Sequence, residues 1–446
     1  MALDRLLFLL SLWLGFVGAT QAALSEPLPP SKDPWYTAPP GFENAEPGTV
    51  LRVRPAPGNL TSVTGNCSAS YNILYRTTDS HFKPTWAVTT LLVPELGPES
   101  NAQLKHQQSA LMSLQVAYDS PDVDASPSNT MYTASNISSI YYGHALAEGI
   151  FVSVPDYEGP LAAFTAGIIS GYATLDSIRA VLSLGLGLNM TNTPSVALWG
   201  YSGGAFATEW ASELAVQYAP ELVAGPVVGA AMGAPLANIT SIMYDVNGGP
   251  TSGLVPNMLL GLTVQYPDVR KYLVSKLNDE SQYNKTDFLA AEGFTITEAG
   301  VAFSKIDINK YFQKGTDIFS DPKITALVNR EGVMGYHGTP RWPMFIYQAI
   351  PDEVTPIAAT DAVVKRHCAV GADILYERNT LGSHFAEANS GYDVAFQWLL
   401  NVFASQHDTR GCVIKDVTRN MNGGGSALRT RGDADKSAVD FWTSAW

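Results

Sequence analysis

Residues 200–204, Gly-Tyr-Ser-Gly-Gly, stand between an apolar run at residues 196–199 and a helix-like stretch at residues 205–218. This order predicts a strand, a sharp turn and a helix, with Ser202 at the turn. Such a turn lifts the serine hydroxyl out of the sheet, and the flanking glycines permit the strained backbone and close helix packing that it requires. The sequence therefore predicts a nucleophile elbow, with Ser202 as a catalytic nucleophile.

The rest of the chain alternates between strand-like and helix-like segments. Apolar runs bounded by Pro, Gly and Asp predict further strands at residues 51–54, 71–76, 86–93, 109–114, 150–154, 223–232, 344–349 and 373–376. Apolar residues have helical spacing at residues 173–184, and a closing helix is expected at residues 392–404. This alternation predicts an α/β fold with a mostly parallel sheet covered by helices.

The alternation stops between Pro235 and Gly338, where the chain becomes a series of short helix-like pieces. An insertion of about a hundred residues is too long for an ordinary loop. We interpret it as a helical lid above Ser202, and a structural excursion without substrate contact is the alternative. The expected organisation is a signal peptide at residues 1–22, an N-terminal arm at 23–48, a catalytic core at 49–235 and 339–419, the lid insertion at 236–338 and a C-terminal tail at 420–446.

The composition is that of a chain that buries a substantial core, since 46% of its 446 residues are apolar and 15% are charged. Its formal net charge of −14 argues against a nucleic-acid partner or an anionic membrane surface, because both attract basic patches. We therefore expect an uncharged or weakly charged small molecule as the substrate.

The N-terminus has the features of a secretory signal. Arg5 precedes an apolar stretch at residues 6–17, and residues 20–22 offer small side chains around a cleavage point. A membrane anchor would need about 20 apolar residues, so this run is too short to span a bilayer. No later segment has the character of a membrane span, and we expect a secreted protein without one.

A serine hydroxyl is a poor nucleophile until a base takes its proton. On a fold of this kind the acid and the histidine follow the serine in the chain, which leaves four histidines: His337, His367, His384 and His407. His384 lies in a turn directly after the strand at residues 373–376 and before the closing helix. His337 lies at the end of the insertion, and the other two lie in polar stretches expected to be solvated. The position of His384 makes it the predicted base.

Asp352 is the matching acid, because it falls on the turn after the strand at residues 344–349 and precedes His384 by one strand–helix unit. Its position favours it over Glu353, Asp361 and Asp373. In the alternative interpretation Asp352 only caps the helix that follows Pro356, since aspartate is common at such positions.

A tetrahedral intermediate needs two hydrogen-bond donors for its oxyanion. One is expected to be the backbone N–H of Gly203, which follows the nucleophile. The second should come from a loop after an earlier strand, and residues 115–120 are the best-placed candidate.

Three cysteines leave at least one without an internal partner. Cys368 and Cys412 flank the last predicted strand and helix, where a disulfide would clamp the C-terminal part of the fold. Cys67 would then be free, buried or paired with another molecule. Glycosylation sequons, which suit a secreted glycoprotein, start at Asn59, Asn66, Asn136, Asn189, Asn238 and Asn284.

Three further patterns are set aside. The Gly-Leu-Gly-Leu run at residues 185–188 lacks the third glycine of a dinucleotide loop, because Met190 takes its place, and it follows a helix rather than a strand. No cofactor is therefore expected. No His, Cys and Asp cluster has metal-ligand spacing, so no metal is expected either. The Arg-Gly-Asp tripeptide at residues 431–433 lies in a polar, Gly-rich tail and is interpreted as a chance match.

Three segments carry a family resemblance: Trp-Gly-Tyr-Ser-Gly-Gly-Ala at residues 199–205, Val-Pro-Asp-Tyr-Glu-Gly at residues 154–159 and Pro-Asp-Glu-Val-Thr-Pro at residues 351–356. With them the mature chain resembles the fungal secretory lipase family over nearly its whole length. The resemblance implies an α/β-hydrolase with a helical lid, a triad on Ser202, Asp352 and His384, an oxyanion loop whose aspartate is Asp119, and a disulfide between Cys368 and Cys412. Val116 and Ala117 make the oxyanion loop somewhat different from the family's.

A narrower resemblance lies at residues 25–39 and 157–188, which are similar to esterases that deacetylate trichothecenes in mycotoxin biosynthesis. It implies removal of a C-3 acetyl group from a polycyclic sesquiterpenoid. Two other functions stay open: a secreted triacylglycerol lipase, and a non-catalytic secreted binding protein that keeps the hydrolase fold.

Overall fold

A computed structural model gives the fold of residues 26–95, 109–132, 138–185, 194–279, 282–407 and 410–419. The expected signal peptide, the sequons at Asn136 and Asn189, and the C-terminal tail at residues 420–446 lie outside these described residues. Within the described part, no helix combines the length and the apolar composition that crossing a bilayer requires.

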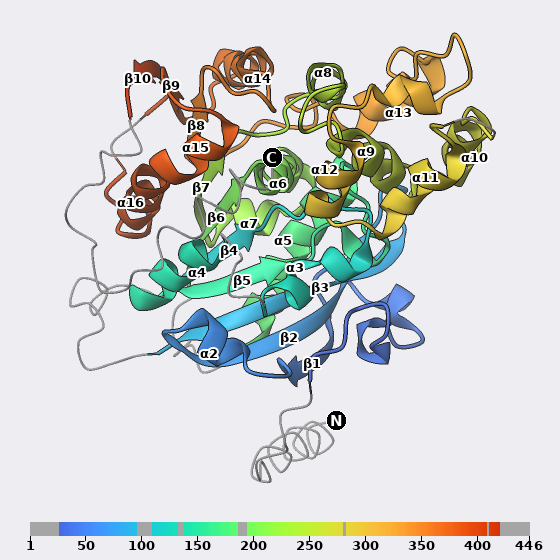
Figure 1. Cartoon of the computed structure of the whole chain (residues 1–446). Helices are drawn as coiled ribbons and strands as arrows, with labels where there is room; N and C mark the ends of the chain where they lie inside the picture. Colours follow the sequence, from blue (N-terminus) through green and yellow to red (C-terminus); the bar gives the residue numbers. More distant parts are fainter. Residues whose placement is uncertain are drawn as a thin grey trace.

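The centre of the molecule is one twisted sheet (Figure 1). In its described part the strand order is β1-β2-β3-β5-β4-β6-β7-β8-β9-β10. The strands are β1 (Val50–Pro55), β2 (Cys67–Thr78), β3 (Pro84–Pro94), β4 (Ala110–Gln115), β5 (Phe151–Pro155), β6 (Ser195–Tyr201), β7 (Val227–Gly233), β8 (Met344–Ala349), β9 (Ile374–Asn379) and β10 (Cys412–Val417). The pairs β1–β2, β2–β3 and β3–β5 are antiparallel, and every pair from β5 to β10 is parallel. The predicted α/β fold with a mostly parallel sheet is confirmed.

Helices cover both faces of this sheet. In chain order they are α2 (Leu60–Thr64), α3 (Pro127–Thr130), α4 (Ser138–Ala147), α5 (Gly167–Leu184), α6 (Gly203–Tyr218), α7 (Pro220–Ala224), α8 (Ile239–Val246), α9 (Leu254–Thr263), α10 (Pro267–Ser275), α11 (Lys285–Leu289), α12 (Ile296–Phe303), α13 (Pro322–Glu331), α14 (Ile357–Ala369), α15 (His384–Ser390) and α16 (Tyr392–Phe403).

Strand β6 is buried on both faces, because successive side chains of a strand point in opposite directions. Val196 and Leu198 join the apolar cluster that contains α5 and α6. Ala197 and Trp199 join the second cluster, to which α4 and α16 contribute. Two-sided burial explains why this strand appears in the sequence as an unbroken apolar run rather than an alternating one.

Two strand predictions need correction. The strand predicted from residue 223 begins at Val227, because the segment before it forms the short helix α7, with Pro220 in its first turn and Gly225 at its end. Strand β10 was not predicted at all. It lies at the sheet edge, and its Val413 and Ile414 are exposed, so burial imposes no apolar pattern on it.

The N-terminal arm packs against the core instead of extending away from it. It forms two short 3-10 turns, Pro34–Tyr36 and Phe42–Asn44. The Tyr36 hydroxyl donates to Ser128 Oγ at 2.9 Å, and Trp86 Nε1 donates to the Tyr36 carbonyl at 2.8 Å. These two contacts join the arm to α3 and to β3, which are far from it in the sequence, so the arm covers the sheet beside these two elements.

The segment between β7 and β8 holds helices α8 to α13, which gather beside the sheet in Figure 1. It is tied back to itself by an isolated antiparallel bridge between Asn238 and Val333, close to its two ends. Its helix α9 is buried along its whole length. The insertion therefore has its own apolar packing and joins the main core cluster.

The turn between β6 and α6 is strained at the serine. Ser202 has φ 54° and ψ −121°, a positive φ that non-glycine residues rarely adopt. Two residues after it, Gly204 lies against β4, and a Cβ atom at this position would be only 1.9 Å from the Gln115 carbonyl oxygen. The predicted elbow thus depends on a glycine that lets α6 approach the end of β4.

This close approach predicts the effect of one added methyl group. We expect Gly204→Ala to lower the free energy of unfolding by about 1–3 kcal/mol, because a backbone atom must move to make room. Denaturant unfolding followed by circular dichroism measures the change. As a matched control, Gly143→Ala lies in α4, where the nearest atom is 4.0 Å away, so its stability should be unchanged or higher by up to about 1 kcal/mol. Equal destabilisation of the two variants would contradict the analysis.

Candidate active site

A continuous line of hydrogen bonds joins the three side chains predicted as a triad. His384 Nε2 lies 2.9 Å from Ser202 Oγ. On the other side of the ring, His384 Nδ1 lies 2.9 Å from Asp352 Oδ2 and 3.1 Å from Asp352 Oδ1. The imidazole is buried, as is the carboxylate. This geometry lets the ring accept the serine proton at Nε2 while the carboxylate holds the proton at Nδ1.

The fold brings the three residues together because they follow three strands of one parallel sheet. Ser202 follows β6, Asp352 follows β8, and His384 begins α15 after β9. The carboxyl ends of parallel strands lie at the same edge, so the three turns meet there. Tyr201 Oη donates to the His384 carbonyl at 2.6 Å, and Glu353 accepts the His384 backbone N–H at 2.8 Å. Both bonds fix the backbone that carries the ring.

Asp352 does more than close its own turn. Its Oδ1 accepts the backbone N–H groups of Val354 and Thr355 at 2.9 and 2.7 Å. The helix α14, however, begins at Ile357 with no side-chain cap. Asp352 is therefore a turn residue that also reaches His384, and it does not cap the helix.

Electrostatics support this pairing. Burial by itself raises the pKa of Asp352, but the His384 imidazole and the two backbone N–H groups outweigh it, so the pKa lies below its ordinary value. For His384, burial lowers the pKa, and the Asp352 carboxylate outweighs that effect and raises it. Each residue thus favours the charged form of the other.

The backbone at the start of α6 and at Asp119 frames the serine. Asp119 has φ 48°, again in the left-handed region. Its carboxyl group lies over Gly203, since a Cβ atom there would be 1.8 Å from Asp119 Oδ1. Burial raises the pKa of Asp119 to about 7, against a lowering effect of His384. The two residues expected to hold an oxyanion are therefore neighbours, and the carboxyl group beside them resists ionisation.

The Asp119 loop is anchored by the insertion. Asn257 in α9 donates its side-chain amide to the Asp119 carbonyl at 2.9 Å, and Ser120 Oγ donates to the Phe294 carbonyl at 2.8 Å. Asn257 is fully buried. Sequence analysis missed it, although a lone asparagine in the apolar run of α9 was an available signal.

A cavity of about 480 Å³ opens at Ser202 and His384. The core contributes residues 114–117 and 383–386 to its wall, and the insertion contributes Leu254, Ile296 and residues 249–251. Besides Ser202 and His384, the polar residues of the wall include Asp119, Asp245, Thr251 and Glu353, although most of the wall surface is apolar. The insertion therefore forms part of the wall, and the site suits a largely apolar molecule with a small number of polar groups.

The other histidines lie elsewhere. The prediction that His367 is solvated is wrong, because it is buried and its Nε2 lies 2.7 Å from Glu209 Oε1. His407 is also largely buried, with Nε2 3.2 Å from Asp373 Oδ2. His337 lies beside Trp210, with ring centroids 4.1 Å apart and the rings tilted by 34°, and its Nδ1 lies 3.4 Å from Glu213 Oε2. Two other acids considered as the triad acid form ion-pair contacts of their own, Asp361 with Arg378 and Asp373 with His407.

The cysteines and sequons can also be placed. Cys368 in α14 and Cys412 in β10 form a disulfide, which ties the edge strand to the helix. Cys67 is unpaired and half-buried, and burial raises the pKa of its thiol. Among the sequons, Asn59 and Asn66 are exposed. Asn238 and Asn284 are half-buried, and each uses its side-chain oxygen to cap a helix.

A serine on a strand–turn–helix elbow, with a histidine and an aspartate from later strands of a mostly parallel sheet, defines a serine hydrolase of the α/β-hydrolase class. The chain belongs to the secretory lipase family, whose family model matches residues 124–411. This confirms the family resemblance predicted from the sequence.

Individual relatives agree with this assignment. The chain is 78% identical to the trichothecene C-3 esterase of Fusarium sporotrichioides, over 100% of both chains. It is 34% identical to lipase A of Arthroderma benhamiae, over 87% of this chain and 83% of that one. The crystal structure of Candida antarctica lipase A in its closed state is similar with a TM-score of 0.77 and 26% identity, over 94% of this chain and 96% of that chain. The chain is therefore a serine esterase of this family.

The Asn257 contact predicts a kinetic effect. We expect Asn257→Asp to lower kcat by about tenfold with little change in KM, because the aspartate presents an acceptor to the Asp119 carbonyl and the loop loses its anchor. Ester hydrolysis under saturating and limiting substrate separates the two constants. Asn278→Asp is the matched control, since the Asn278 amide also donates to backbone carbonyls of the insertion, those of Lys310 and Phe312. A normal kcat in Asn257→Asp would refute the positioning role.

Proposed function

We propose that this chain removes the C-3 acetyl group of a trichothecene, with Ser202, His384 and Asp352 as its catalytic triad. The observation that carries the proposal is the hydrogen-bonded line from Ser202 through His384 to Asp352 at the wall of the cavity. The substrate comes from the 78% identical relative, whose name specifies a trichothecene C-3 esterase. A cavity whose wall surface is mostly apolar, with polar side chains distributed along it, suits a compact polycyclic alcohol that carries a small acyl group.

In the first half of the reaction, Ser202 Oγ attacks the carbonyl carbon of the acetyl ester while His384 Nε2 takes its proton. The backbone N–H groups of Gly203 and Asp119 bind the oxyanion that forms. The intermediate collapses, the C–O bond to the alcohol breaks, and His384 gives its proton to the departing alcohol oxygen. The enzyme is left as acetyl-Ser202 with a neutral imidazole.

In the second half, water replaces the alcohol. His384 takes a proton from the water as its oxygen attacks the acetyl carbon, and the same two N–H groups bind the second oxyanion. Acetate then leaves as His384 returns the proton to Ser202 Oγ. Asp352 keeps the imidazole in the tautomer that presents Nε2 to the serine throughout.

The same proposal includes a route through the secretory pathway. The predicted signal at residues 1–22, the disulfide between Cys368 and Cys412, and the family name support it. The exposed sequons at Asn59 and Asn66 are the proposed glycan sites best placed for access, and those at Asn136, Asn189, Asn238 and Asn284 remain proposals as well.

The substrate is tested by comparing a 3-acetylated trichothecene with an emulsified long-chain triglyceride, using Ser202→Ala as the control. We expect fast release of acetate from the toxin, slow hydrolysis of the fat, and loss of both in the folded Ser202→Ala protein. The opposite preference would favour a triacylglycerol lipase. Activity retained in Ser202→Ala would refute the nucleophile, and failure of wild type to react with a serine-directed fluorophosphonate would favour a non-catalytic protein.

The pairing of His384 with Asp352 predicts the pH profile. His384 must be neutral to act as base, so kcat/KM should rise with pH through its raised pKa, above the ordinary value of 6.5. Asp352→Asn removes the group that raises this pKa, so the rising limb should move to lower pH, and kcat should fall by about 10⁴-fold.

The control for this profile is Asp361→Asn, which removes a carboxylate paired with Arg378 on the surface side of α14 and β9. Its pH profile should match that of wild type. If the rising limb of the Asp352→Asn profile lies at the same pH as in wild type, Asp352 does not raise the pKa of His384.

A further inference from the structure

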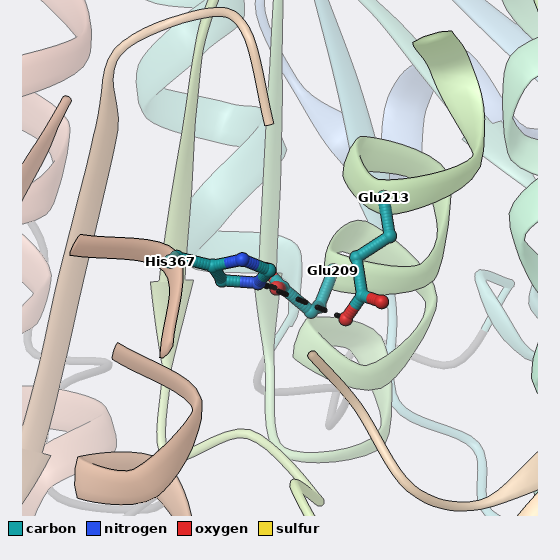
Figure 2. Close-up of side chains that lie close together, drawn as sticks. All are labelled: Glu209, Glu213 and His367. Carbon is teal, nitrogen blue, oxygen red and sulfur yellow. Dashed lines mark hydrogen bonds and ion pairs between the residues drawn. The ribbon is translucent and has the colours of Figure 1, made fainter. Parts of the chain in front are cut away.

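The buried side chains of Glu209, Glu213 and His367 point toward one another (Figure 2). The two glutamates are four residues apart and therefore share one face of α6, while His367 comes from α14. All three side chains are buried, with at most 2% of any side chain exposed. Their potential ligand atoms lie within 4.8 Å of one another. Neither the elbow nor the cavity uses these residues.

The cluster sets two carboxylates against one buried imidazole, and the Nδ1 atom of a second histidine, His337, lies 3.4 Å from Glu213 Oε2. Glu213 is well held, since the backbone N–H groups of Gly335, Tyr336 and His337 all donate to it. Glu209 has only His367 on Oε1, and its Oε2 is buried without a hydrogen-bond partner. With a protonated imidazole the three side chains would still carry one net negative charge. Two adjacent buried carboxylates require either a shared proton or a cation between them.

The donor set is that of a transition-metal site. Zinc binds both imidazole nitrogen and carboxylate oxygen in proteins, and three protein ligands with a water in the fourth position form an open tetrahedral site. Bond lengths of about 2.0–2.1 Å in tetrahedral geometry separate neighbouring ligand atoms by about 3.3 Å. His367 Nε2 lies 2.7 Å from Glu209 Oε1 and 3.8 Å from Glu213 Oε1, so shifts of about half an ångström would reach that spacing.

We propose that Glu209, Glu213 and His367 bind one divalent transition-metal ion, with zinc as the ion to test. The ion would neutralise both carboxylates and so offset the charge on Glu209 Oε2, which is buried without a hydrogen-bond partner. The sequence shows no metal-ligand spacing among His, Cys and Asp, because two of these ligands are glutamates and the third lies more than 150 residues after them. The site would tie α6, which begins at the elbow, to α14 and to the segment that follows α13.

The test uses the full chain and does not depend on any substrate. The purified protein is incubated with zinc chloride, passed through gel filtration in metal-free buffer, and analysed for metal by mass spectrometry and for Tm by circular dichroism. We expect about one zinc ion per chain, a Tm that falls on treatment with dipicolinate, and recovery when zinc is returned. Calcium and magnesium should not replace it, because they require more oxygen ligands.

Two variants locate the ion. Glu209→Gln keeps the shape and mimics a carboxyl that holds a shared proton, so it should fold, bind less than about a tenth of the wild-type zinc, and lose the zinc-dependent rise in Tm. His407→Asn removes a histidine paired with Asp373 outside the cluster and should bind zinc as wild type does.

Two outcomes would overturn the proposal. If the wild-type protein retains no zinc and its Tm changes with neither zinc nor chelator, the two carboxylates share a proton instead of a metal ion. Equal zinc in Glu209→Gln and wild type would place the metal elsewhere.

Discussion

The contact between Gly204 and the Gln115 carbonyl is the constraint on which the site depends. It brings the first turn of α6 against the end of β4, and so sets the distance between the elbow and the Asp119 loop. Thr208, one turn further along α6, donates to the side chain of Gln115 at 2.9 Å and reinforces the same approach. Because the two proposed oxyanion donors, at Gly203 and Asp119, come from both sides of this contact, a displacement of α6 would separate them.

Helix α6 then connects the site to the rest of the molecule. Its N-terminus carries the serine turn, its middle carries Glu209 and Glu213, and its face toward α5 is packed through Trp210. On the opposite edge of the site, the insertion holds the Asp119 loop through Asn257. The serine is therefore supported by core packing and the oxyanion loop by the insertion, so the two halves of the site depend on different parts of the chain.

The sequence predicted those features that follow from strand ends. Ser202, Asp352 and His384 were predicted as a triad because each lies in the segment that follows a predicted strand, and parallel strands place such segments at one edge. Burial partners were not predictable in this way. His367 appeared solvated because its neighbours in sequence are polar, whereas its surroundings come from α6, more than 150 residues earlier. Strand β10 was missed for the related reason that an exposed edge strand carries no burial pattern.

Several buried acids surround the site, and their protonation bears on how it stabilises negative charge. Behind the Asp119 loop, both carboxyl oxygens of Glu158 are buried without a partner, and burial raises its pKa well above the ordinary value. Burial likewise raises the pKa of Asp156 to about 7 despite its hydrogen bonds from Ser128. An ionised carboxylate beside Gly203 would oppose an oxyanion, whereas a neutral one would not. Because burial raises these pKa values above those of the unfolded chain, the folded protein is most stable with respect to these groups below the ordinary carboxyl pKa, and that stability is lost as pH rises from there through the raised values. In a chain with a net charge of −14, burial thus favours the neutral forms of Asp119, Asp156 and Glu158, and Asp352 is the acid of the site whose pKa is lowered.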